Sequence, residues 1–300
     1  MTRPVIFVVN PAAGRGRVGG MVGRLEAILA KTGQPYRLVL TQAPGHGVEV
    51  ARQAPEGSRV VAVGGDGTVH EVVRGLAGLG PGSDKAVGVV PVGSGNDFAR
   101  MLGLRNLTLE AAVHTAFSGR VRPIDLGMVN GRPFAGSLGI GFDAEVAQKA
   151  LTAPPLLTGL PRYLYSIFGV LSGLSLPTLS LRSSGATLHQ GKALMVALMN
   201  GRTYGGGIPV VPGAKFDDGL ISGVVAGEFG RLGVLGILPR LLRGTHVGDP
   251  RVRLFEGTDF VLDFDRPVPA QADGEALGSA QTYRVGLIPA GLRVIEFSPL

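Results

Sequence analysis

The 300-residue chain contains no cysteine and no tryptophan, and only 17% of its residues are charged. Without cysteine it can form neither a disulfide bond nor a thiolate metal site, and its five histidines show no metal-ligand spacing. Its apolar tracts are interrupted by Arg, Gly or Pro well before they reach the length that spans a bilayer, and no signal-peptide pattern follows Met1. We therefore expect a cytoplasmic globular protein with two domains or one large one.

The charge is basic, with a net value of +7 and only five lysines among the 29 basic residues. Such a surface suits nucleotides and anionic lipid headgroups. The arginines are scattered, and no aromatic residues are interleaved with them in a basic patch. We therefore expect no nucleic-acid partner.

The first 120 residues alternate short apolar runs with helical patterns, which predicts stacked β-α-β units. Ligands of open parallel sheets bind at the carboxyl ends of the strands. Three loops rich in Gly, Asn or Asp (residues 10–17, 64–68 and 91–97) should therefore line one edge. The expected strands cover residues 5–9, 36–40, 60–63 and 87–90, and the expected helices cover residues 18–29, 47–54, 68–79 and 109–117.

From about residue 121, short strand-like runs separated by turn signals predict a β-rich second domain. We place an α/β nucleotide domain at residues 1–122 and a β-rich, sandwich-like domain at residues 123–290. Helical patterns interrupt the second domain at residues 143–151, 163–174 and 232–242. Its expected strands cover residues 124–129, 133–137, 178–181, 193–200, 220–225, 252–255, 260–264, 283–287 and 292–297.

The loop Gly64-Gly65-Asp66-Gly67-Thr68 follows a buried apolar run and opens a helical pattern. Glycine lets the backbone approach a ligand closely, and the N–H groups at a helix start suit an anion. An aspartate in such a loop would repel phosphate unless Mg²⁺ or a reacting hydroxyl lies between them. The loop therefore indicates phosphoryl transfer rather than simple phosphate binding.

The other two loops carry weaker signals. Residues 10–17 hold two glycines and two arginines but lack the Gly-Lys-Ser/Thr of a Walker loop, and no acidic residue ends the second strand as a dinucleotide fingerprint requires. A structural turn explains this loop equally well. In residues 91–97, glycines surround Ser94, and Asn96-Asp97 is typical of a helix N-cap.

Together the three loops resemble the diacylglycerol kinase catalytic-domain family, which includes phosphatidylglycerol kinase-like proteins and sphingosine kinases. Further matches lie at residues 139–143, 212–220 and 273–275. The resemblance implies a nucleotide domain similar to NAD kinase and phosphofructokinase, ATP in the interdomain cleft, and transfer of its γ-phosphoryl group to a lipid hydroxyl. It also implies that the last segment, residues 291–300, returns to the first domain.

The resemblance assigns roles by position. Glu275 would be the proton acceptor, Asp273 would support it or Mg²⁺, and Asp66 would orient catalytic Mg²⁺ or the acceptor. From the residues alone, an acidic β-turn is the better explanation of residues 273–275. The nucleotide contacts would be Asn10, Thr41, Gly64, Gly65, Asp66, Gly67, Thr68, Val69, His70, Ser94 and Asn96.

A second metal site is implied at Asp218, together with the backbone carbonyls of Lys215 and Leu220. Hard oxygen ligands of this kind suit Mg²⁺ or Ca²⁺. A metal-free Asp-Gly turn fits the same residues equally well.

The acceptor is expected in the apolar second domain, as a lipid reached at the inner face of the membrane. An NAD kinase-like enzyme with a soluble substrate and a non-catalytic lipid-binding regulator remain alternatives. The sequence leaves open which lipid is used and whether the chain forms a homodimer. A stripe at helical spacing could line an acyl-chain slot, although it also fits an ordinary core: Leu156, Leu157, Leu160, Tyr163, Leu164, Ile167, Phe168 and Leu171.

Overall fold

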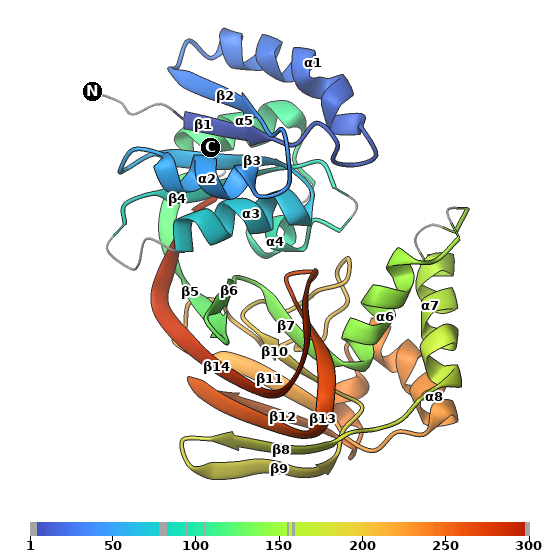
Figure 1. Ribbon diagram of the computed structural model, residues 1–300. Coiled ribbons are helices and arrows are strands. Elements are labelled where there is room, and N and C mark those ends of the chain that lie inside the picture. Colours follow the sequence, from blue (N-terminus) through green and yellow to red (C-terminus); the bar gives the residue numbers. More distant parts are fainter. Residues whose placement is uncertain are drawn as a thin grey trace.

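The computed structural model describes residues 5–77, 83–93, 95–104, 106–154, 156–157 and 160–297. Figure 1 shows an α/β domain above a β-rich domain. The first domain is built on parallel strands in the order β4-β3-β1-β2, and every residue of β1 is buried, as expected where helices cover both faces of a parallel sheet. These strands are β1 (Val5–Val9), β2 (Tyr36–Leu40), β3 (Arg59–Gly64) and β4 (Ala86–Pro91).

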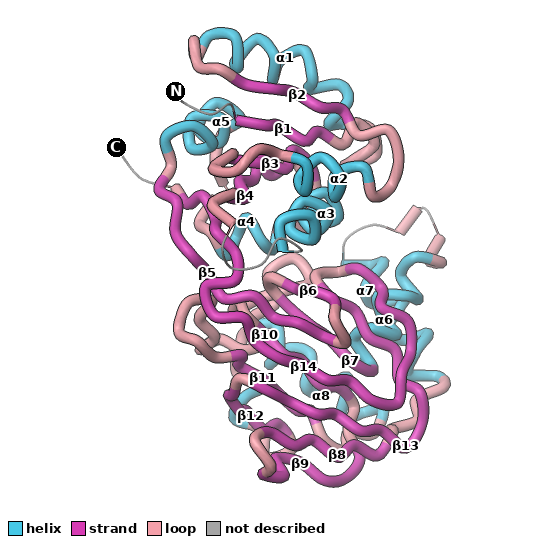
Figure 2. Tube along the Cα trace, turned by 60° about the vertical axis from the view of Figure 1, so that its left-hand side comes forward, coloured by secondary structure: helices cyan, strands magenta, loops and turns pink. Residues whose placement is uncertain are grey.

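Helices cover the two faces of this sheet (Figure 2). Because successive strand residues point to opposite faces, Ile6 and Val8 pack against α2, α3 and α4, whereas Phe7 and Val9 pack against α1 and α5. The short helix α4 begins directly after Asn96, where the sequence indicated a helix N-cap. The helices are α1 (Arg17–Lys31), α2 (His46–Gln53), α3 (Asp66–Ala77), α4 (Asp97–Met101) and α5 (Leu109–Ser118).

The second domain contains mainly antiparallel strands, in the order β12-β11-β10-β7-β13-β14. The hairpin of β8 and β9 continues from β13, and β5 and β6 continue from β14. The strands are β5 (Arg120–Val129), β6 (Arg132–Phe134), β7 (Ser137–Gly141), β8 (Thr178–Ser183), β9 (Ala186–Lys192), β10 (Met195–Met199), β11 (Ile221–Ala226), β12 (Val252–Gly257), β13 (Asp259–Ala272) and β14 (Glu275–Glu296).

Three helices pack on one face of this second sheet: α6 (Phe142–Leu151), α7 (Leu160–Ser172) and α8 (Arg231–Leu242). The alternation of β10 shows the two faces. Val196 and Leu198 point into a core formed between strands, while Ala197 and Met199 pack under the helices. A short 3₁₀ turn, η1 (His246–Gly248), follows α8.

Strand β14 connects the two domains. It begins at Glu275, pairs with β13 and then with β5, and ends beside β4, where Arg293 and Val294 pair in parallel with Ala86 and Val87. The expectation of two separate strands at residues 283–287 and 292–297 was wrong. The chain continues as one strand between them, with a left-handed φ of +51° at Ala290 and a register shift against β5 between Ile288 and Leu292.

The expected fold class is confirmed, with an α/β first domain, a β-rich second domain and a mixed sheet that runs through both. The strands predicted at residues 5–9 and 36–40 have the observed bounds. Strand β9 was missed, because its exposed residues lack an apolar alternation. No helix in the described parts of the chain is long and apolar enough to cross a bilayer.

Candidate functional site

The carboxyl ends of the parallel strands form one edge, as predicted. Val9 is level with Leu40 and with Val63, and Gly64 is level with Pro91. The ladder continues one residue further: the N–H of Asn10 donates to the Val63 carbonyl (3.2 Å), and that of Thr41 to the Val9 carbonyl (2.8 Å). Asn10 and Thr41 therefore lie beside the loop after β3, although the Asn10 side chain accepts a hydrogen bond from the N–H of Ala12.

The glycines after β3 and β4 allow these two loops to touch. A Cβ atom on Gly93 would lie 2.7 Å from the Cα of Gly65, and one on Gly95 would lie 2.5 Å from Oδ2 of Asp66. A Cβ atom on Gly64 would lie 2.3 Å from Oγ1 of Thr68. Glycine is needed at these positions for packing within the protein, whatever ligand the loops hold.

Asp66 links the two loops. Its Oδ2 accepts the N–H of Asn96 and its Oδ1 accepts the N–H of Asp97, both at 2.9 Å. These donors lie at the start of α4, so Asp66 caps that helix from a distant part of the chain. Burial and then the negative charge of Asp97 raise the pKa of Asp66, while the two N–H donors act against this shift. Only the remaining lone pairs of Asp66 are available to a metal or an acceptor.

Asp97 extends this link to the second domain. Gly205, Gly206 and Gly207 all have left-handed backbone angles, and successive N–H groups in such a loop form a concave site for an anion. Here the Oδ2 of Asp97 accepts the N–H of Gly206 at 2.9 Å. Burial raises the pKa of Asp97, against the effect of the Gly206 donor and of Arg100. Its Oδ1 is buried without a hydrogen-bond partner among the described residues.

Arg100, one helical turn after Asp97, reinforces the same connection. Its guanidinium donates to the carbonyls of Gly95 (3.2 Å) and Gly206 (2.9 Å), one from each domain. A Cβ atom on Gly207 would lie 2.6 Å from Cζ of Arg100. The start of α4 and the glycine loop, residues 205–207, therefore fix the first domain against the second.

Asp273 has a structural role that the sequence did not indicate. Its Oδ2 accepts the N–H of Ala135 (2.7 Å), and its Oδ1 accepts those of Gly136 and Ser137 (both 2.8 Å). Asp273 itself has a φ of +49° and Gly274 one of +86°, so the turn between β13 and β14 is tight. Three N–H donors hold this carboxylate in place, and it stabilises the turn that starts β14.

Glu275 stands on that turn as the first residue of β14, and its side chain is exposed. A Cβ atom on Gly67 would lie 3.3 Å from Oε1 of Glu275. The structure therefore brings this carboxylate, from the second domain, to the first turn of α3. The N–H groups of Asp66 and Gly67, in that same turn, have no acceptor within the helix.

Four of the predicted nucleotide contacts are buried. They are Gly64, at the end of β3, and Thr68, Val69 and His70, in α3. The N–H groups of Thr68 and Val69 donate to the Gly65 carbonyl, and the Nδ1 of His70 is 3.8 Å from Oδ2 of Asp273. Three consecutive residues of α3 are buried because this helix packs against α2, β3 and β6 on different sides. Gly65, Asp66, Gly67 and Asn96 remain at the loop junction, and Ser94 lies outside the described residues.

The predicted second metal site lies on a turn held against β5. Asp125 accepts the N–H of Gly219 through Oδ2 (2.7 Å), and its own N–H donates to the Phe216 carbonyl (2.8 Å). Asp218 is exposed, and its Oδ1 accepts the N–H of Leu220 at 3.2 Å. No group of three or more His, Cys, Asp or Glu side chains suited to a metal occurs in the described residues. Any metal here would depend on backbone carbonyls.

A buried polar cluster lies behind β7. The Oδ2 of Asp143 accepts hydrogen bonds from Tyr204 (2.9 Å) and Gln271 (3.2 Å), while its Oδ1 is buried without a partner among the described residues. Burial raises the pKa of Asp143 to about 6. Burial and the charge of Asp143 raise the pKa of Tyr163 to about 12. Tyr204 directly precedes the glycine loop, so this cluster supports the interdomain connection.

Several of these residues had little or no signal in the amino-acid sequence. The run Gly205-Gly206-Gly207 indicated an unusual backbone conformation, but nothing in the sequence indicated its contact with Asp97. Nothing in the sequence indicated a role for Arg100 or Tyr204. The proposed acyl stripe divides: Ile167 and Leu171 are core residues, while Leu156, Leu164 and Phe168 are exposed. The side chain of Leu160 lies outside the described residues.

Two family models together match almost the whole chain. The diacylglycerol kinase catalytic domain matches residues 4–129. The YegS C-terminal NAD kinase beta sandwich-like domain matches residues 136–296. The join between the two matches falls at the β5–β7 segment.

Similar proteins include a probable lipid kinase YegS-like from Chromohalobacter salexigens, 31% identical over 90% of this chain and 86% of that protein. The diacylglycerol kinase of Bacillus subtilis is 26% identical over 90% of this chain and 88% of that enzyme. Among solved structures, a diacylglycerol kinase from Bacillus anthracis has a TM-score of 0.73 at 22% identity, covering 98% and 97% of the two chains. An Archaeoglobus fulgidus NAD kinase in complex with ATP has a TM-score of 0.54 at 11% identity, covering 97% and 93%. These structures show the fold.

The buried carboxyl group of Asp143 predicts a pH dependence of stability. Its folded pKa of about 6 lies above the ordinary value of 3.8, so the folded state binds this proton more tightly than the unfolded state. The contribution of this group to the free energy of unfolding is therefore greatest below about pH 4. It falls by on the order of 3 kcal/mol as the pH rises to about 6. Urea unfolding from pH 4 to 7, followed by circular dichroism, should show that Asp143→Asn lacks this fall. Parallel curves for the two proteins would contradict the assignment.

Proposed function

Because the chain belongs to the diacylglycerol kinase catalytic-domain family, we propose that it transfers the γ-phosphoryl group of ATP to the hydroxyl of a lipid. The observation that carries the proposal is the position of Glu275, an exposed carboxylate from the second domain that lies against Gly67 in the first turn of α3. A general base and a phosphate-binding helix start meet at this point.

The nucleotide would bind along the carboxyl ends of β1 to β4. The N–H groups of Asp66 and Gly67 are oriented for a phosphate, and Asn10 and Thr41 lie along the same edge. In this proposal Thr68, Val69 and His70 support the loop from inside and do not contact ATP. Gly65 and Gly93 contribute by letting the two loops touch, and Gly64 leaves room for the side chain of Thr68.

Glu275 would accept the proton of the lipid hydroxyl. As the lipid oxygen forms its bond to the γ-phosphorus, the bond between that phosphorus and the β–γ bridging oxygen breaks, and ADP leaves with the bridging oxygen. Asp273 would act as a positioning residue, because three backbone N–H groups already hold its carboxylate. Replacing Glu275 and replacing Asp273 should therefore have different effects, although both residues lie at the same turn.

Mg²⁺ fits the acidic pair of Asp66 and Asp97. Both carboxylates have raised pKa values through burial. The Oδ1 of Asp97 has no hydrogen-bond partner among the described residues, and Nε of Arg100 lies 3.7 Å from it. Carboxylate oxygens are the ligands that Mg²⁺ prefers. When bound with ATP, the ion would offset the negative charge that develops during phosphoryl transfer.

The names of the similar proteins favour a lipid acceptor over a soluble one. We propose that the lipid is reached at the inner face of the membrane, by a protein located in the cytoplasm. Diacylglycerol, phosphatidylglycerol and sphingoid bases all offer a primary hydroxyl beside acyl chains. A screen of these lipids and NAD with labelled ATP distinguishes the acceptors, and labelling of NAD alone would overturn the proposal.

Replacing the two carboxylates separately tests their roles. Glu275→Gln should lower kcat by about 10²–10⁴-fold without changing the free energy of unfolding, because the side chain is an exposed general base. Asp273→Asn should lower the free energy of unfolding by about 1–3 kcal/mol, because its amide group would oppose a backbone N–H. ATP turnover with lipid in mixed micelles and urea unfolding measure both effects. Full activity in Glu275→Gln would exclude this residue as the base.

We also propose a structural divalent cation at Asp218, with the carbonyls of Lys215 and Leu220 as further ligands. One Asp218 oxygen is bonded to the Leu220 N–H, which leaves the other for the cation. Adding millimolar Mg²⁺ should raise the melting temperature of the wild-type protein in the absence of nucleotide. Asp218→Asn should abolish the increase, and Asp217→Asn should retain it, because Asp217 pairs with Arg122 at 2.8 Å. An equal increase in all three proteins would rule out this site.

A further inference from the structure

Exposed apolar side chains gather on the helical layer of the second domain. Among the described residues, ten large apolar side chains are exposed, and seven belong to α6, α7, α8 or the segment between α6 and α7. Leu156 is 95% exposed, Leu232 84% and Phe168 55%. We call this set the apolar face: Leu151, Leu156, Leu164, Tyr165, Phe168, Leu232 and Leu242.

The apolar face is separate from the core beneath it. Leu164, Tyr165 and Phe168 occupy one side of α7, whereas Ile167 and Leu171 point into the core. A hydrogen bond from Arg231 to the Ser172 carbonyl (2.8 Å) joins the start of α8 to the end of α7. Figures 1 and 2 show α6, α7 and α8 together on one side of the domain.

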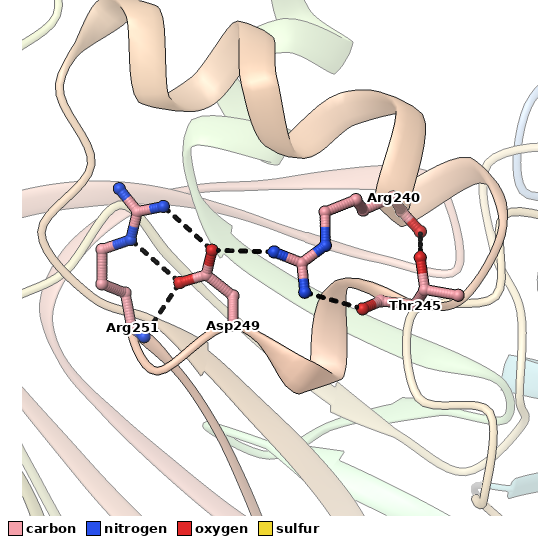
Figure 3. A network of polar contacts seen from close by, with 4 residues as sticks. All are labelled: Arg240, Thr245, Asp249 and Arg251. Carbon is pink, nitrogen blue, oxygen red and sulfur yellow. Dashed lines mark hydrogen bonds and ion pairs between the residues drawn. The ribbon is translucent and has the colours of Figure 1, made fainter.

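An ion-pair network holds α8 in its orientation. Asp249 accepts hydrogen bonds from Arg240 (3.1 Å) and from Arg251 (2.9 Å to each oxygen), and Arg240 also donates to the Thr245 carbonyl (3.2 Å), as Figure 3 shows. The hydrogen bonds and charge of Arg251 are the main reason that the pKa of Asp249 falls to about 2. The network remains ionised at neutral pH. Leu232 and Leu242 are thus held outward on a fixed helix.

Most charges around the apolar face are basic, although the exposed Glu228 lies just before α8 and pairs with Lys192 at 3.1 Å. Neither α7 nor α8 contains an acidic residue, and the sequence has none between Glu145 and Asp217. Lys149, Arg231 and Arg243 are exposed in or beside these helices. Apolar side chains bordered by cations match a bilayer surface, where anionic headgroups lie above hydrocarbon.

From these observations we propose that the apolar face docks onto anionic membranes, with Leu156, Leu164 and Phe168 entering the headgroup–acyl boundary. The inference rests on the proposed function only in its choice of a lipid surface as the partner. In Figure 1 the upper ends of α6 and α7 point toward the first domain. Docking through them would bring the membrane to the side of the protein where the domains meet.

The absence of tryptophan provides a direct test. Phe168→Trp places a single tryptophan on the apolar face, and Leu254→Trp places one on β12 at a similar exposure of 52%. Vesicles of phosphatidylglycerol with brominated acyl chains should quench Trp emission at position 168 by at least half and shift it to the blue, but leave position 254 unchanged. Phosphatidylcholine vesicles should have little effect at either position.

Several outcomes would overturn the inference. These are no quenching at position 168, equal quenching at position 254, or equal response to the two lipids. A blue shift at position 168 that grows with protein concentration without lipid would identify a second copy of the chain as the partner. Phosphorylation of lipid in micelles without insertion would leave the proposed function standing, whereas insertion without phosphorylation of any lipid would support docking and contradict the kinase.

Discussion

The site depends on the three hydrogen bonds by which the backbone of residues 135–137 holds the carboxylate of Asp273. They fix a turn with two left-handed residues, Asp273 and Gly274, and this turn determines where Glu275 begins strand β14. Since β14 then continues into the first domain and pairs with β4, the same strand carries the proposed base and joins the domains. The position of Glu275 relative to α3 is therefore set at both ends of the strand.

A second constraint acts between the loops of the first domain. Asp66 caps α4, and the close approach of Gly93 to Gly65 leaves no room for a side chain at position 93. Asp97 and Arg100 then extend the contact to the glycine loop of the second domain. Glycines that resemble phosphate-binding residues therefore also allow these loops to pack closely at the site. Phosphate binding and close packing would each explain why glycine occurs there, and close packing requires no ligand.

Much of the fold could be predicted from the sequence, because buried parallel strands give continuous apolar runs. The bounds of β1 followed directly from this pattern, as did the common edge that holds Asn10 and Thr41. Those of β2 were also predicted, although it is an edge strand in which no residue is buried. The continuity of β14 could not be predicted, since its exposed middle residues look like a turn. The family resemblance identified the acidic residues but not the groups that form hydrogen bonds with them. Backbone N–H groups more than a hundred residues away hold Asp273, and hydrogen bonds of this kind leave no pattern in a sequence.

The central claim is that Glu275 acts at the first turn of α3, and the contact with Gly67 allows it to be tested directly. A methyl group on Gly67 would lie 3.3 Å from Oε1 of Glu275 and should displace it, while alanine favours the helix. The decisive measurement is a double-mutant cycle of Gly67→Ala and Glu275→Gln in single-turnover phosphoryl transfer. We predict that each substitution slows transfer and that the double variant is no slower than Glu275→Gln. If the rate of the double variant falls by the product of the two single reductions, the account is contradicted.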